Sequence, residues 1–119
     1  MAEDELIKTF IEEYGGACDE FSKTRYKNAT ILFSKALFAL CDFIIVSKLK
    51  RLPQNHAERF KILKNYFPEI YPIVDEVFDK YTDSYSKPIL KETGEGIKNA
   101  IATIKHRTEL PQEIKDTLE

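Results

Sequence analysis

The sequence predicts an all-α fold: an up-and-down bundle of four to five helices that forms one domain over residues 1–119. Apolar residues recur at intervals of three and four, as on one face of a helix. Alternating strand patterns are nearly absent, and no Asn-Gly or Asp-Gly hairpin turn occurs. A chain of 119 residues buries about two-thirds of its unfolded surface, which is enough for a core without disulfides.

The first two helices differ in how much apolar surface they present. The first has a single apolar face and ends or is interrupted at Gly15-Gly16. The second, from about Lys23 to Lys50, is apolar on nearly every side in the stretch "ATILFSKALFALCDFIIV". A helix of that kind belongs at the centre of a bundle or in an oligomer interface. The apolar face of the first helix consists of Leu6, Ile7, Phe10, Ile11 and Tyr14.

Proline and capping residues divide the rest of the chain. Pro53 ends the second helix, and Asn55 with Glu58 three residues later resembles a capping box at the start of the third. A fourth helix begins near Pro68, and a looser stretch over residues 82–96 precedes the last long helix. Pro111 starts a polar tail, for which we expect one more helical turn or a frayed end.

Composition excludes several classes of protein. The net charge of −2 gives no global basic field, which argues against tight, non-specific nucleic-acid binding. Cys18 and Cys41 are too few for a disulfide framework, and no Cys/His cluster has metal-ligand spacing, so we expect no metal and no cofactor.

Lys35 and Asp42 interrupt the apolar stretch 29–46, and each costs about 2.5–3.5 kcal/mol at a bilayer centre. With an acidic N-terminus unlike a signal peptide, the sequence predicts a cytoplasmic protein outside the membrane.

Three groups of residues are candidates for a functional site. On the second helix, Lys35 and Asp42 share one face but lie about 10 Å apart along the axis, so each needs another partner. They either line a ligand-binding cleft, or the lysine reaches solvent while the aspartate bonds to a neighbouring helix. At the end of the fourth helix, Tyr81 and Tyr85 are spaced to stack on bases, or to pack in the core with only their hydroxyls exposed.

The third group is Arg51 and His56, in an R-x4-H arrangement, with Arg59 one turn further on. An imidazole can move the proton of an RNA 2′-hydroxyl, and a guanidinium can stabilise charge on the scissile phosphate. The spacing by itself is a weak signal, because such pairs arise readily by chance. The structural alternative makes His56 a first-turn helix residue beside the Asn55 cap.

The order of these segments resembles the HEPN superfamily, small helical domains named for higher eukaryotes and prokaryotes nucleotide-binding. The resemblance covers roughly residues 17–107. It consists of a first helix, the long apolar helix "NATILFSKALFALCDFII", a loop ending in "NHAERF", a helix closing on "VFDKYTDSY", and a final helix. It implies a bundle that often dimerises, and a place beside nucleotidyltransferase partners in toxin–antitoxin pairs.

Active members of that family are metal-independent ribonucleases with an R-x4-6-H motif late in the domain. The corresponding segment "DKYTDSY" contains neither arginine nor histidine, and Arg51 and His56 stand earlier. The chain is more similar to members that keep a histidine at this earlier place and a tyrosine at the position of Tyr85, without the nuclease motif.

Three functions follow as expectations. The first is a HEPN-like binding module, dimeric and non-catalytic, for a nucleotide or a nucleotidyltransferase partner, with Lys35, Asp42, Arg59, Tyr81 and Tyr85 as ligand-binding residues. The second is a metal-independent ribonuclease of toxin type that uses Arg51 and His56 on RNA. The third is a purely structural or antitoxin-like interaction protein.

Overall fold

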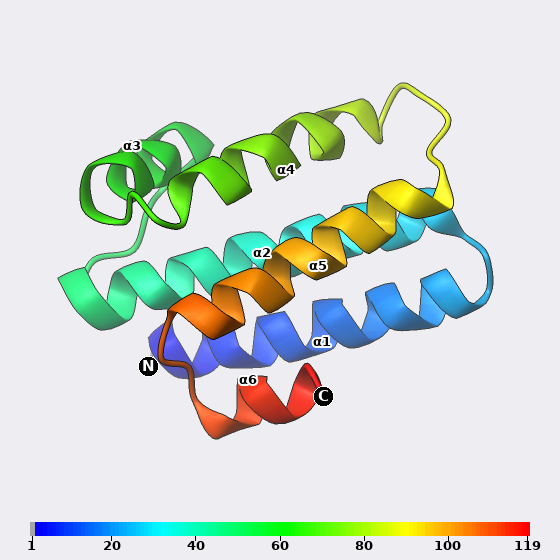
Figure 1. The fold of residues 1–119 in the computed structure, drawn as a ribbon. Helices are drawn as coiled ribbons and strands as arrows, with labels where there is room; N and C mark the ends of the chain where they lie inside the picture. Colours follow the sequence, from blue (N-terminus) through cyan, green and yellow to red (C-terminus); the bar gives the residue numbers. More distant parts are fainter. Residues whose placement is uncertain (1) are drawn as a thin grey trace.

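Six helices make up the computed structural model, which describes residues 2–119, and no strand occurs in that range. Four long helices run up and down beside one another, while the shorter α3 and α6 lie at the margins (Figure 1). The predicted all-α bundle is therefore confirmed, and α6 supplies the extra turn after Pro111. The helices are α1 (Ala2–Ser22), α2 (Tyr26–Leu49), α3 (His56–Tyr66), α4 (Tyr71–Asp83), α5 (Lys91–Arg107) and α6 (Gln112–Thr117).

Helix α2 is the central element of the bundle. It packs against α1, α3, α4 and α5, and its most extensive partner is α1. Fifteen of its 24 residues are buried, which explains why its sequence is apolar on nearly every side. By length and composition α2 could also cross a bilayer, but 83% of its most apolar window is buried among the other helices.

Helix α1 continues through Gly15-Gly16, contrary to the expected end or interruption there. Its apolar face continues beyond the glycines with Ala17 and Phe21, and the Phe21 ring packs edge-on against Phe33 of α2. This packing stabilises two further turns, so tertiary contacts outweigh the low helix propensity of glycine. The chain reverses only at Thr24, which has a φ of 61°.

Helix α5 begins earlier than the sequence indicated, at Lys91, and it shortens the looser stretch predicted over residues 82–96. Gly94 is buried inside the helix, and a Cβ there would lie 3.4 Å from the Phe21 ring and 3.5 Å from the Thr30 hydroxyl. The glycine therefore allows α5 to approach α1 and α2 closely, rather than providing a flexible loop.

The connection from α2 to α3 follows the predicted capping pattern. Lys50 ends α2 in the left-handed conformation, with a φ of 59° and its N–H donating to the Val46 carbonyl. The side chain of Asn55 accepts a hydrogen bond of 2.8 Å from the Glu58 N–H and so caps α3. The cap fixes where α3 starts, and with it the position of His56.

Because α2 organises the core, we expect Leu40→Ala to lower the free energy of unfolding by about 2–5 kcal/mol, as a buried leucine truncation does. Leu40 is fully buried, whereas Leu90 is 68% exposed. Leu90→Ala is the matched control, with an expected change below about 0.5 kcal/mol. Urea unfolding followed by circular dichroism measures both, and equal effects would contradict the central role of α2.

Candidate functional site

An open cleft of about 300 Å³ lies where α1, α2, α3 and α4 meet. It unites residues that are distant in sequence, and it includes five of the seven predicted site residues. Glu13 and Thr9 of α1 and Phe38 of α2 complete much of the wall. The predicted residues that line the cleft are Lys35, Asp42, His56, Arg59 and Tyr81.

The strongest polar contact in the cleft is the ion pair between Asp42 and Arg59. Arg59 Nε donates to Asp42 Oδ1 at 2.6 Å, and Nη2 donates to Oδ2 at 2.8 Å, so the pair is bidentate. Each side chain is only 11% exposed. The guanidinium also lies 5.3 Å from the centroid of the Phe38 ring. Asp42 thus has the partner on a neighbouring helix that it requires, and the pair ties α2 to α3.

His56 is bound to the same guanidinium. Nη1 of Arg59 lies 2.6 Å from Nδ1 of His56. Since a guanidinium can only donate hydrogen bonds, Nδ1 must be the unprotonated acceptor, and the neutral ring carries its hydrogen on Nε2. Burial and the charge of Arg59 lower the pKa of His56, although Asp42 acts in the opposite direction. The imidazole is therefore neutral at pH 7.

Aromatic rings form the other wall of the cleft. The Phe38 ring packs edge-on against His56 at 5.0 Å and against Tyr81 at 5.2 Å. The Tyr81 hydroxyl lies 3.0 Å from that of Tyr85. Burial and this hydrogen bond raise the pKa of Tyr81 to about 12, so the phenol stays protonated. Of the two alternatives for these tyrosines, packing in the core describes Tyr85 poorly, because Tyr85 lies just beyond the end of α4 and is 55% exposed.

Lys35 and Glu13 provide opposite charges at the mouth of the cleft. Lys35 is exposed and forms no ion pair within residues 2–119. Burial raises the pKa of Glu13, while the charge of Lys35 lowers it and that of Glu12 raises it. A ligand can therefore meet one free cation, one carboxylate and a wall of aromatic rings.

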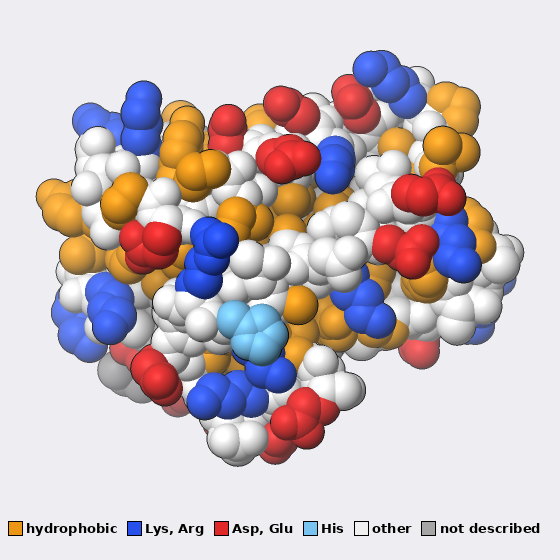
Figure 2. All heavy atoms as spheres, in the orientation of Figure 1, with side chains coloured by type: hydrophobic (Ala, Val, Ile, Leu, Met, Phe, Trp, Pro, Cys, Tyr) orange, Lys and Arg blue, Asp and Glu red, His pale blue; other side chains and the backbone are white. Residues whose placement is uncertain are grey.

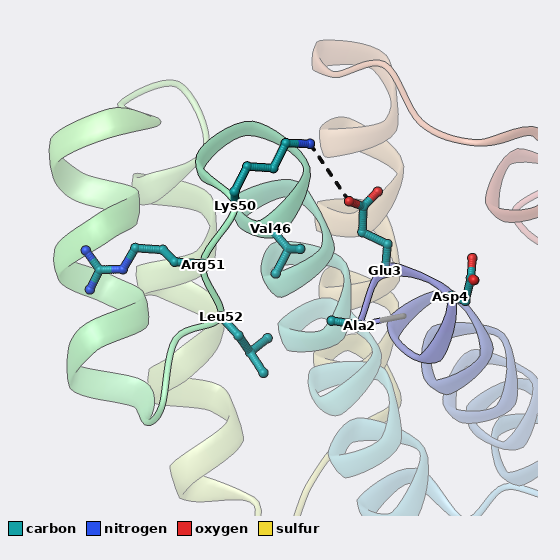
Figure 3. Close-up of a pocket in the computed structure, with 7 residues that line it drawn as sticks. All are labelled: Ala2, Glu3, Asp4, Val46, Lys50, Arg51 and Leu52. Carbon is teal, nitrogen blue, oxygen red and sulfur yellow. Dashed lines mark ion pairs between the residues drawn. The ribbon is translucent and has the colours of Figure 1, made fainter.

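Arg51 is not brought into the cleft with His56. Its guanidinium donates to Glu58 at 3.1 Å, and the Arg51 side chain is 59% exposed. The residue borders a separate pocket of about 440 Å³, together with Val46, Lys50 and Leu52. Figure 3 shows the Arg51 side chain pointing away from Lys50, which pairs with Glu3 of α1. The R-x4-H spacing is present in the sequence, but the histidine is bound to Arg59.

Sequence reasoning missed the contribution of α1 to the site. Thr9 and Glu13 lie one turn apart on that helix, beside the predicted apolar face. Their spacing indicates a shared face, but nothing in the sequence shows that this face borders α3. Among residues 2–119 no three His, Cys, Asp or Glu side chains are grouped to hold a metal ion.

Comparison with known proteins leaves the family open. No family model matches the chain, and neither the search of the curated proteins nor that of the solved structures gave a match. The geometry of the residues therefore carries the functional argument.

The Asp42–Arg59 pair predicts an asymmetric response to mutation. We expect Asp42→Asn to lower the free energy of unfolding by about 3–5 kcal/mol, because it leaves a buried guanidinium without its counter-charge. The double variant Asp42→Leu/Arg59→Met should recover most of that loss. Glu58→Gln at the exposed Arg51 pair is the control, with an expected loss below about 1 kcal/mol. Similar losses in both single variants, measured by urea unfolding, would contradict the assignment.

The contact with Arg59 predicts how His56 titrates. Because the folded pKa is lowered, the unfolded chain binds a proton first as the pH falls. The contribution of His56 to stability is therefore complete above about pH 6.5, the ordinary histidine value, and is lost below it. In NMR, Nε2 should carry the hydrogen at pH 7, and Arg59→Met should raise the pKa. A protonated Nδ1 at pH 7 would refute the hydrogen-bond assignment.

Proposed function

We propose that this chain is a HEPN-like helical binding module without ribonuclease activity, and that its cleft binds a nucleotide. The observation that carries the proposal is the closed network of Asp42, Arg59 and His56 beside an aromatic wall. In this network the side chains that RNA cleavage would need are held in structural contacts, while Lys35 stays free to bind a ligand.

The network disfavours acid–base catalysis by His56. A general base needs an available lone pair, but Nδ1 already accepts from Arg59 and Nε2 carries the hydrogen. Stabilising a phosphate in the transition state requires an uncompensated cation, whereas Arg59 is paired with Asp42 and Arg51 with Glu58. The alternative, a ribonuclease based on Arg51 and His56, would have to break the Arg51–Glu58 ion pair and the hydrogen bond between Arg59 and His56.

The remaining groups suit a nucleotide. Bases stack on aromatic side chains, and Tyr81 and His56 line the cleft. Lys35 can bind a phosphate at the mouth, and the Glu13 carboxylate can accept from an exocyclic amine or a ribose hydroxyl. A purely structural role, as in an antitoxin-like protein, uses the Asp42–Arg59 pair but leaves the exposed Lys35 without a function.

The proposal also includes a homodimer, a nucleotidyltransferase partner and a cytoplasmic location. The dimer and the partner rest on the family resemblance, and the location rests on the composition. The apolar surface of α2 no longer argues for a dimer, since one chain buries most of it. Among residues 2–119, the large apolar side chains that stay exposed, and so remain for a partner, are Leu52, Tyr66, Tyr85 and Leu90.

Adenosine 5′-monophosphate is a direct probe of the cleft. We expect millimolar or tighter binding, seen by NMR as shifts of amides around Lys35, His56 and Tyr81. Lys35→Gln should weaken it about tenfold, the effect of about 1.4 kcal/mol. Lys27→Gln, on the same helix but outside the cleft lining, should change it less than about twofold. Binding that is insensitive to Lys35 would contradict the proposed phosphate contact.

An RNA cleavage assay tests the alternative function, a ribonuclease. With single-stranded RNA in EDTA, we expect no cleavage by the wild-type protein, His56→Ala or Arg51→Ala. Cleavage by the wild type that both substitutions abolish would replace the binding module with the ribonuclease. If neither nucleotide binding nor cleavage is observed, the structural role is favoured.

A further inference from the structure

A second cavity, of about 380 Å³, lies between α1, α5 and α6, and is lined by a residue set distinct from that of the cleft. This volume is within the usual range for small-molecule sites. One face of α5 contributes Lys98, Asn99, Lys105 and His106, and α1 contributes Tyr14. In Figure 2, lysine and arginine side chains lie close to a histidine where the C-terminal half of α5 meets α6, with acidic side chains nearby.

The cations of this cavity are not paired with any carboxylate of residues 2–119. Lys98, Lys105 and His106 form neither an ion pair nor a side-chain hydrogen bond with any of residues 2–119. The two lysines are seven residues apart, hence two turns on the same face of α5. Glu95 is the one carboxylate in the lining, so the lysines leave a net positive charge. Lys105 and His106 lie in the last turn of α5, where the helix dipole favours positive charge. Lys98 lies earlier in the helix, so the dipole does not explain a lysine there.

Tyr14 adds a hydroxyl group to the cavity. Its side chain is only 5% exposed and packs between the rings of Phe10 and Phe33. The hydroxyl has no hydrogen-bond partner among residues 2–119, yet the residue lines the cavity. The oxygen is not fully buried, so it can bind a ligand or solvent from the cavity. Burial raises the pKa of Tyr14 to about 12, so the hydroxyl keeps its hydrogen and can donate it to an anion.

We propose that this cavity is a binding site for a small organic monophosphate. Lysine is a common phosphate ligand, and a phosphate dianion can balance the charges of Lys98 and Lys105 and accept from the Tyr14 hydroxyl. Two apolar side chains, Phe21 of α1 and Leu118 directly after α6, also line the cavity and can cover the organic part of the molecule. The site differs from the nucleotide cleft in its residues and in its charge.

Phenyl phosphate tests this site, with inorganic phosphate and phenol as partial probes. In an NMR titration at low salt, phenyl phosphate should shift the amides of α5 and of α1 near Tyr14, rather than those of α3. We expect inorganic phosphate to bind about tenfold more weakly, and phenol not to bind in the millimolar range. Equal affinity for inorganic phosphate would reduce the site to an ion site and overturn the proposal, as would the absence of shifts with phenyl phosphate.

Substitutions separate a built site from general attraction to a basic surface. Lys98→Gln and Lys105→Gln should each weaken binding of phenyl phosphate about tenfold. Lys91→Gln, an exposed lysine on the same helix but outside the cavity, should change it less than about twofold. Equal effects at all three positions would overturn the proposal.

The hydroxyl of Tyr14 has its own test. Tyr14→Phe keeps the packed ring and removes only the group that lacks a partner. We expect the free protein to unfold at about the same temperature, because the hydroxyl forms no hydrogen bond with residues 2–119 that the substitution could remove. Binding of phenyl phosphate should weaken several-fold. A lower melting temperature, or unchanged binding, would refute the role of Tyr14 in the site.

Discussion

The burial of α2 is the constraint on which the rest of the structure depends. With 15 residues removed from solvent, this helix requires neighbours on almost every side, and α1, α3, α4 and α5 supply them. Small side chains such as Ala29, Ala36 and Ala39 let those neighbours approach closely. The same burial makes every polar group on α2 expensive unless it has a partner. Ser34 finds its partner within the helix, because its hydroxyl donates to the Thr30 carbonyl at 2.8 Å.

Asp42 has no partner for its buried carboxylate within α2, and the partner that it finds on α3 determines the geometry of the cleft. A carboxylate that is only 11% exposed needs a cation with matching geometry, and the planar fork of Arg59 provides it. Once Arg59 is fixed by Asp42, its remaining donors hold the ring of His56 in one tautomer. A single buried charge on α2 therefore fixes the orientation of α3 and also the protonation state of the residue most suited to catalysis.

The sequence predicted the helices better than their contacts. Local signals were sufficient for the Asn55 cap and for the apolar pattern of α2, because each depends on neighbouring residues. The expected end or interruption at Gly15-Gly16 was wrong, and Gly94 lies inside α5 rather than in the looser stretch predicted over residues 82–96, because packing around Phe21 extends α1 and accepts the glycine of α5. For the site, the need of Asp42 for a partner was predictable, but its identity was not. Asp42 and Arg59 are 17 residues apart, and only the turn between α2 and α3 brings them together.

The two cavities differ in how their charges are balanced, and this difference should separate their ligands. In the cleft, Arg59 is neutralised by Asp42, and Lys35 faces Glu13. Binding there must depend on stacking and on a single phosphate contact, so it should tolerate salt. The cavity of α1, α5 and α6 has two unpaired lysines and one carboxylate, so its affinity should depend mainly on charge and fall as salt screens it. A molecule with a planar base that can stack on the aromatic wall therefore favours the cleft, and a compact dianion favours the cavity.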